Sequence, residues 1–240
     1  ASADIAAGDH VHSHNCTIGE HDRAYAAGVD LQAARAAVPS MPEASFQGYR
    51  RADGKIGTRN YIALCATVNC SATVIRQAAE QIRASGILAD YPNVDGVFAL
   101  AHGTGCGMAA EGPGWDNLQR VLWGYATHPN VGSAVFVGLG CEVMQVARMK
   151  AAFQGNGEER FHGLTIQDSG GTLATIAAIR ARVEALLPQV NAIERSPCPV
   201  SALSVALQCG GSDGYSGITA NPALGVAADM LVGHGGAVIL

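Results

Sequence analysis

Tyr-Ile-Ala-Leu-Cys-Ala-Thr-Val, residues 61–68, is a mostly apolar run of strand length, and the polar triplet Asn69-Cys70-Ser71 follows it directly. From Ser71 to Arg83, apolar residues recur at the i, i+3, i+4 spacing of an amphipathic helix. A strand, a short loop and a helix in this order form the first half of a βαβ unit. The stretch therefore predicts that the next strand lies parallel to the first.

The same order repeats along the chain on both sides of this stretch. The predicted strands are Tyr61–Val68, Val94–Ala101, Ser133–Leu139, Gly163–Ile166, Leu203–Leu207 and Gly236–Leu240. The predicted helices are Ser71–Arg83, Gly114–Ala126, Glu142–Phe153, Thr172–Leu187 and Pro222–Val232. This alternation predicts an α/β fold, a mostly parallel sheet with helices on both faces. Ligands of such sheets bind beyond the carboxyl ends of the strands.

Composition indicates a compact globular protein and argues against several classes of partner. The 240 residues are 48% hydrophobic and 15% charged, which is enough to build a sizeable core. The net charge is -5 and no basic cluster is longer than Arg50-Arg51, so we expect no nucleic-acid partner. The apolar runs are far shorter than the ~20 residues that span a membrane. The cysteines, 7 in number and scattered, favour a reducing compartment, and we expect a cytoplasmic protein.

Histidines recur at every second residue near the beginning of the chain. A turn at Gly8-Asp9 followed by a strand would place His10, His12 and His14 on one strand face. Neutral imidazoles in that arrangement suit iron, manganese or zinc, and the alternative is an exposed strand edge. Residues 17–47 have weak periodicity and are predicted to be a linker.

Cysteines occupy four of the loops that follow predicted strands. They are Cys70, Cys106, Cys141 and Cys209, and glycines surround the last three. Three interpretations remain open: a metal or iron-sulfur site, plain packing, or a single nucleophilic or redox-active thiol. No local Cys-x-x-Cys pair of the structural zinc type occurs, so convergence depends on the fold. Cys65 and Cys198 are predicted to be buried hydrophobic residues.

Two rival enzyme classes lack their motifs. No Gly-x-x-x-x-Gly-Lys-[Ser/Thr] phosphate loop occurs, and the loop after the first strand lacks Gly-x-Gly-x-x-Gly. Gly-x-Ser-x-Gly is also absent, which leaves a nucleophile-elbow hydrolase without support.

Four segments carry a resemblance to a known family. They are Gly48–Tyr61, the glycine-rich loop His102–Met108, Gly138–Glu142 and the long motif Leu207–Gly225. Together they resemble the altronate/galactarate dehydratase family. The resemblance covers 48–240, which is predicted to be the α/β dehydratase domain.

The beginning of the chain resembles a second part of these enzymes. Val11–Asn15 is similar to the end of the small, β-rich SAF domain that they carry, so residues 1–16 are predicted to be the tail of that domain. Family members continue beyond the strand equivalent to Gly236–Leu240. We therefore expect the chain to be a portion of a longer protein.

The resemblance implies a hydro-lyase that converts a sugar acid to a 2-keto-3-deoxy acid with a divalent metal. Ferrous iron is the expected metal, Mn²⁺ is an alternative, and an iron-sulfur cluster remains open. Removing a proton next to a carboxylate builds negative charge, so the site needs a cationic clamp and a positioned base. The predicted metal ligands are His12, His14, Cys70, Cys106, Cys141 and Cys209.

Further residues are predicted to bind substrate or transfer protons. Arg59 would clamp the carboxylate through its planar fork, with Asn60 beside it, whereas Arg50 and Arg51 should tolerate replacement by lysine. The catalytic candidates are His102, Glu142 and Asp213. The other substrate-binding candidates are Thr104, Ser212 and Ser216. For each catalytic candidate a structural alternative stands: a surface histidine, a carboxylate at a helix start, and a turn residue.

Two other functions remain open. The family that the chain resembles also includes large subunits of sulfolactate sulfo-lyases, which release sulfite in place of water. The chain could also be a non-catalytic half that binds metal or sugar acid and needs a partner chain. A homo-oligomer, or pairing with the missing domains, is expected.

Overall fold

The computed structural model describes residues 1–10, 12, 14, 15, 17, 29, 32, 33, 38–152, 160–208 and 214–240. They belong to two compact units, Ala1–Pro39 and Ser40–Leu240. The predicted linker ends at residue 47, whereas the second unit begins at Ser40 and its first strand at Ser45.

The described residues of the first unit form turns and bends. The His12 N–H donates to Asn15 Oδ1 at 2.9 Å, and Asn15 Nδ2 donates to the carbonyl of His10 at 3.0 Å. These local bonds replace the ladder bonds that a strand would make. The predicted histidine strand is therefore wrong for the described residues, because His12 lies in a bend and His14 in a turn. The rings of His10 and His12 still stack, with centroids 5.6 Å apart.

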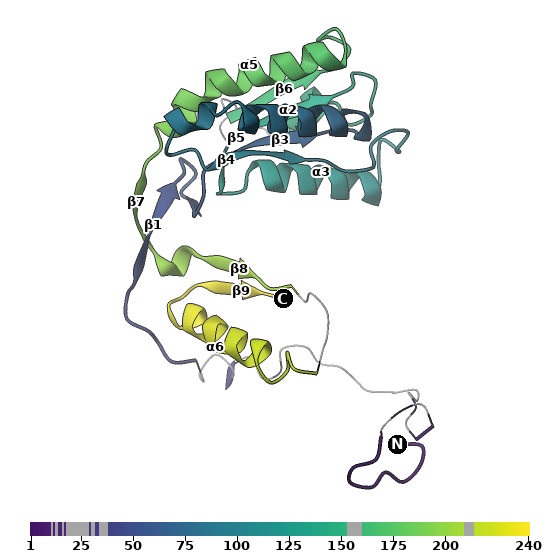
Figure 1. The fold of residues 1–240 in the computed structure, drawn as a ribbon, viewed down its shortest axis with the longest axis vertical. Helices are drawn as coiled ribbons and strands as arrows, with labels where there is room; N and C mark the ends of the chain where they lie inside the picture. The colour runs from purple at the N-terminus through teal and green to yellow at the C-terminus, as the bar shows by residue number, and fades with distance from the viewer. Residues whose placement is uncertain are drawn as a thin grey trace. The chain divides into compact units, whose positions relative to one another are not determined.

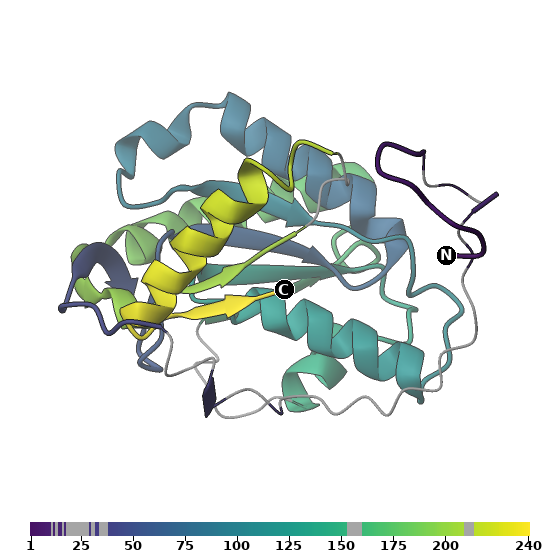
Figure 2. The same cartoon turned by 90° about the horizontal axis from the view of Figure 1, so that it is seen from below.

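A four-stranded parallel sheet forms the centre of the second unit (Figure 1). Its strands are β3 (Tyr61–Ala66), β4 (Gly96–Leu100), β5 (Val131–Gly138) and β6 (Phe161–Thr165), in the order β4-β3-β5-β6. β3 and β5 are central, and β5 is buried along its whole length, which explains the continuous apolar runs. The arrowheads in Figure 2 point toward one edge, the carboxyl edge. The predicted α/β class is confirmed.

Helices cover both faces of this sheet. They are α2 (Ala72–Ala84), α3 (Pro113–Ala126), α4 (Val146–Ala152) and α5 (Thr172–Asn191). α2 and α5 bury their apolar residues on one face, and α3 and α4 bury theirs on the other. Figure 1 shows α2, α3 and α5 beside the sheet. α4 begins at Val146 and not at the predicted Glu142, so the loop after β5 is longer than expected. None of the helices in the described ranges is long and apolar enough to cross a membrane.

A three-stranded antiparallel sheet was not predicted. β1 (Ser45–Arg50) lies between β2 (Ile56–Gly57) and β7 (Arg195–Pro199). β7 contains two prolines and pairs with a strand some 150 positions earlier, for example Gln47 with Pro197. Proline is tolerated here because β7 is an edge strand. The pairing joins the beginning and end of the parallel-sheet region.

The last two predicted strands form a sheet of their own. β8 (Ser204–Ala206) and β9 (Ala237–Ile239) pair in parallel, with α6 (Ala220–Gly233) between them in the chain. The expectation of one continuous sheet is therefore wrong for the described strands. The physical reason is β7, whose antiparallel pairing with β1 interrupts the βα alternation. Short 3-10 turns are η1 (Asn69–Ser71), η2 (Ile87–Asp90) and η4 (Val200–Ala202).

Candidate active site at the carboxyl edge

Three cysteine loops meet at the carboxyl edge of the parallel sheet. Cys70 follows β3, Cys106 follows β4 and Cys141 follows β5, and β3 lies between the other two strands. The Cys70 thiol lies within hydrogen-bonding reach of Cys106, and Cys141 is close enough to act on it electrostatically. All three are free and exposed, whereas Cys65 and Cys198 are buried as predicted. The topology thus brings three soft sulfur donors to the same edge of the sheet.

The surroundings of Cys70 make its thiolate harder to form. Desolvation raises the pKa of this thiol, and the neighbouring Cys106 and Cys141 raise it further, because a second negative charge nearby is unfavourable. A cation bound among the three sulfurs would reverse this effect by stabilising the thiolates.

His102 fixes the loop that carries Cys106. Thr104 N–H donates to His102 Nδ1 at 3.2 Å, so His102 Nε2 carries the proton and donates to the Ala66 carbonyl at 2.9 Å. The Asn69 N–H donates to the Thr104 carbonyl at 2.8 Å, which ties this loop to the one that carries Cys70. Both ring nitrogens of His102 therefore bind the chain itself. The geometry favours a positioning role over the predicted proton transfer.

Glu142 fixes the loop that carries Cys141. It is buried, 6% exposed, and lies in the loop between β5 and α4, four residues before the helix begins. The predicted position at a helix start is therefore wrong. Its Oε2 accepts from the N–H groups of Leu139 and Gly140 at 3.1 and 2.6 Å, and its Oε1 accepts from Thr67 Oγ1 at 3.0 Å. The carboxylate links the end of β3 to the Cys141 loop.

Replacing Glu142 by alanine should lower the free energy of unfolding by about 2–4 kcal/mol, because two amide donors and a hydroxyl lose their buried acceptor. Glu142→Gln should cost less, since it keeps one acceptor oxygen. Urea unfolding measures the change, and Glu80→Ala, on the exposed side of α2, is the control. An unfolding midpoint equal to that of the control would contradict this role.

Arg59 and Asn60 lie at the opposite edge of the sheet. They precede β3, whereas Cys70 follows it, and a strand of this length separates the two edges by about 20 Å. Asn60 is fully buried, and its Nδ2 donates to the carbonyls of Asn93 and Val190 at 2.8 and 2.9 Å. Its Oδ1 accepts from Arg51 Nη1 at 2.8 Å, so both ends of this carboxamide are engaged inside the protein. Arg59 is exposed at that edge, so it does not share a site with the thiols of this unit.

The remaining candidates are placed as follows. Thr104 is exposed in the loop after β4. Ser216 is half-buried in the turn before α6, where its carbonyl accepts from the Asn221 N–H. His12 and His14 belong to the first unit, and their approach to the sheet edge stays a prediction. Cys209, Ser212 and Asp213 lie outside the described residues.

A polar cavity of about 500 Å³ opens beside the Cys141 loop. Its walls come from the loop after β5, from α4, from β6 and from the loop after β6. The side chains of Gln145, Gln167, Asp168 and Ser169 line it, and none of them was predicted. The sequence signal that could have indicated these residues is the polar run that follows the predicted strand Gly163–Ile166. The loop contains no cysteine, and the prediction relied on cysteines.

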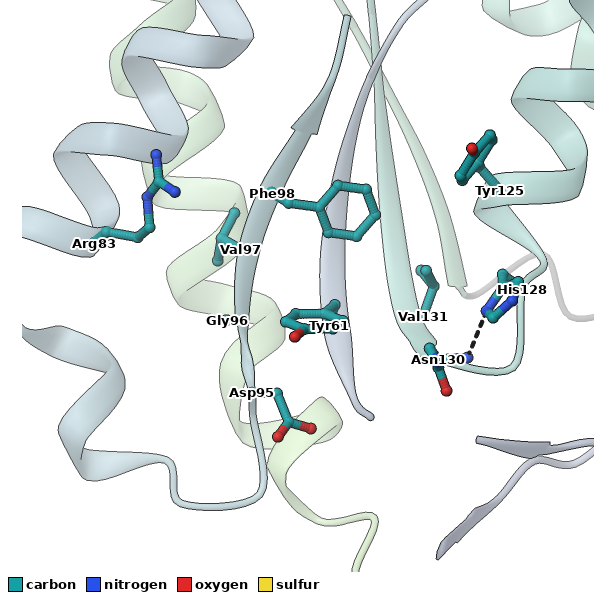
Figure 3. A pocket seen from close by; sticks show the side chains of 10 residues that line it. All are labelled: Tyr61, Arg83, Asp95, Gly96, Val97, Phe98, Tyr125, His128, Asn130 and Val131. Carbon is teal, nitrogen blue, oxygen red and sulfur yellow. Dashed lines mark hydrogen bonds between the residues drawn. The ribbon is translucent and has the colours of Figure 1, made fainter. Parts of the chain in front are cut away.

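A second cavity, of about 470 Å³, lies at the amino edge (Figure 3). Tyr61, Phe98 and Tyr125 give it an aromatic lining. Two of its polar side chains are already engaged: Asp95 accepts from the Asn60 N–H and pairs with Arg195, and Asn130 Oδ1 accepts from the Thr58 and Arg59 N–H groups. The three cysteine loops, in contrast, all lie at the carboxyl edge.

Known proteins similar to this chain identify its family. Residues 48–191 match the family described as D-galactarate dehydratase/altronate hydrolase, second domain, and residues 200–240 match D-galactarate/altronate dehydratase, C-terminal. The chain belongs to the galactarate/altronate dehydratase family.

Individual relatives carry the names of two enzymes of the family. Altronate dehydratases of Bacillus subtilis strain 168 and Escherichia coli strain K12 are 33% and 36% identical over 100% of the chain. A galactarate dehydratase (L-threo-forming) of Escherichia coli strain K12 is 38% identical over 84% of the chain. The chain covers 46%, 47% and 40% of these proteins, so it spans about half the length of the curated relatives that it matches.

The second-domain match of this dehydratase family coincides with the cysteine site. It begins inside β1 and ends at the last residue of α5, so it contains β3, β4 and β5 with their three cysteine loops and the polar cavity. The C-terminal match contains β8, α6 and β9.

The three cysteines of this domain are side chains of a type that binds iron. Cysteine thiolates are ligands of iron and of iron-sulfur clusters, and the Cys70–Cys106 pair with Cys141 supplies three of them. Within the described ranges, no group of three or more His, Cys, Asp or Glu side chains is arranged closely enough to hold a metal ion. The described thiols therefore match iron in kind, and a complete ligand cage is not formed by them alone.

Proposed function

We propose that the protein to which this chain belongs is a metal-dependent sugar-acid dehydratase of the altronate or galactarate type. The observation that carries the proposal is the match with two altronate dehydratases along the whole chain, including all three described cysteine loops. The product would be a 2-keto-3-deoxy acid.

The reaction removes a proton next to the carboxylate and expels the hydroxyl of the following carbon. Iron is the proposed metal, held by Cys70, Cys106 and Cys141, with Cys209, His12 and His14 as further predicted ligands. When bound, the metal supplies a Lewis acid that stabilises the charge developing on the carboxylate and on the leaving hydroxyl. Asp213 stays the predicted group for proton transfer.

The described residues of the chain hold the thiols in position. His102 and the Thr104 backbone join the Cys106 loop to the end of β3 and to the Cys70 loop. Glu142 and Thr67 join the Cys141 loop to the same strand end. All three loops are thus anchored at the end of β3 before any ligand binds, which lowers the reorganisation that binding requires.

The complete iron-loaded protein should form a keto acid from altronate, from galactarate or from both. A carbonyl-specific reagent measures the product, and removal of the metal by a chelator should abolish it until ferrous iron is restored. Sulfite release from sulfolactate would favour the sulfo-lyase alternative. Formation of no keto acid from any sugar acid by iron-loaded protein would contradict the proposed function.

The chain alone can be compared with the complete protein in the same assay. If both proteins bind iron but only the complete protein is active, the active site of the chain alone is incomplete. Light scattering of the complete protein tests the expected homo-oligomer.

A further inference from the structure

The polar cavity beside Cys141 has the chemistry of a site for a neutral polyol. The carboxamides of Gln145 and Gln167 and the hydroxyl of Ser169 can each donate and accept hydrogen bonds, as sugar hydroxyls do. Val146 and Leu164 add apolar wall that suits the C–H groups of a carbon chain. At about 500 Å³ the cavity has the size of a small-ligand site.

The charge of the cavity discriminates between the two ends of a sugar acid. Glu142 and Asp168 line it, and no lysine, arginine or histidine is among its described lining residues. A carboxylate placed here would meet like charge without a cationic partner. A hydroxymethyl end meets no such penalty.

Asp168 is held in place by the chain. Thr165 Oγ1 donates to Asp168 Oδ2 and accepts from the Asp168 N–H at 3.2 Å. This leaves Oδ1 of the carboxylate for a ligand hydroxyl. Gln145 Nε2 donates to the Gly140 carbonyl at 3.3 Å, which turns one wall of the cavity toward the Cys141 loop.

Glycine at position 140 keeps Gln167 in the cavity wall. A Cβ there would lie 2.4 Å from Gln167 Oε1, and the φ of +124° also disfavours any other residue. In the described part of the chain the carboxamide of Gln167 makes no hydrogen bond, so its donors and acceptor are available to a ligand.

We infer that this cavity binds the hydroxyl-bearing tail of the substrate and that Asp168 selects a monocarboxylate sugar acid over a dicarboxylate one. The inference rests on the proposed function and deepens it. Altronate ends in a neutral hydroxymethyl group, whereas galactarate carries a second carboxylate at that end. With the reacting end at the thiol loops, the distal end of galactarate would face Asp168.

The test measures kcat/KM of the complete iron-loaded protein with altronate and with galactarate. The wild type should prefer altronate at least tenfold. Asp168→Asn, which keeps the bond from Thr165, should reduce that preference about tenfold, chiefly by raising kcat/KM for galactarate. Gln167→Ala should lower kcat/KM for altronate about tenfold. Asp116→Asn, at the beginning of α3, is the matched control and should leave the preference unchanged.

Two outcomes would overturn the inference while the proposed function stands. One is a wild-type preference for galactarate, which needs no variant and is independent of how the variants fold. The other is an Asp168→Asn protein that melts like the wild type and keeps the same preference within twofold. Absence of any dehydration by the iron-loaded wild type would instead overturn the proposed function, and this inference with it.

Discussion

Serine at position 70, 106 or 141 should lower the iron content of the complete protein at least tenfold, with a parallel loss of dehydratase activity. The alcohol of serine is a far poorer ligand for ferrous iron than a thiolate, and each of the three loops supplies one sulfur to the same edge of the sheet. Iron and acid-labile sulfide are measured after anaerobic purification. Sulfide equal to iron would indicate a cluster, and iron without sulfide a mononuclear site.

Cys65→Ala and Cys198→Ala are the controls for the iron analysis. Both residues are fully buried, and burial raises the pKa of the Cys65 thiol to about 12, so neither side chain is placed to bind iron at the edge of the sheet. Their iron content should equal that of the wild type. Iron retained by all three serine variants would contradict the cysteine site and return these residues to the packing interpretation.

Local periodicity was enough to predict the parallel sheet. β3 and α2 lie within two residues of their predicted ends, because a central strand buried on both sides and a one-sided helix leave strong patterns. β1 and β7 leave no such pattern. β7 is short, contains two prolines, and owes its conformation to pairing with β1 far away in sequence.

Topology alone predicts which loops lie at the same edge of the sheet. Cysteines that follow neighbouring parallel strands lie at one edge, as Cys70, Cys106 and Cys141 do. The roles of single polar residues were harder to predict from the sequence. Glu142 was taken for the start of a helix because the apolar spacing of α4 extends backward through Met144, a core residue of the preceding loop.

Buried polar contacts also decide the roles of the arginines before β3. From the sequence, Arg59 was the important residue and Arg51 a tolerant one. In the structure Arg59 is exposed, whereas Arg51 is only 6% exposed and its guanidinium reaches three acceptors. The substrate role of Arg59 stays a prediction. Sequence spacing carries no signal for this difference, since it depends on the carbonyl of Pro129, which comes from the turn before β5.

Replacing Arg51 by alanine should lower the free energy of unfolding by about 3 kcal/mol or more. Its guanidinium donates to the Pro129 carbonyl at 2.7 Å, to Asn60 Oδ1 at 2.8 Å and to the Arg59 carbonyl at 3.1 Å. Burial lowers its pKa to about 10, with a further contribution from Arg160, so it is still charged at pH 7. Alanine would leave buried acceptors without donors, and each costs about 1–3 kcal/mol.

Replacing Arg51 by lysine distinguishes the contribution of its charge from that of its hydrogen-bond geometry. One ammonium keeps the charge but cannot reach three acceptors that the planar fork spans, so Arg51→Lys should lose about half as much stability as Arg51→Ala. Arg50→Ala is the matched control, because Arg50 is exposed and makes one hydrogen bond, to the Pro197 carbonyl at 2.8 Å. It should cost within about 1 kcal/mol. The three variants are compared by urea unfolding of the purified protein. Equal unfolding midpoints for Arg51→Ala and Arg50→Ala would show that the buried guanidinium of Arg51 does not stabilise the connection between the antiparallel sheet and β3.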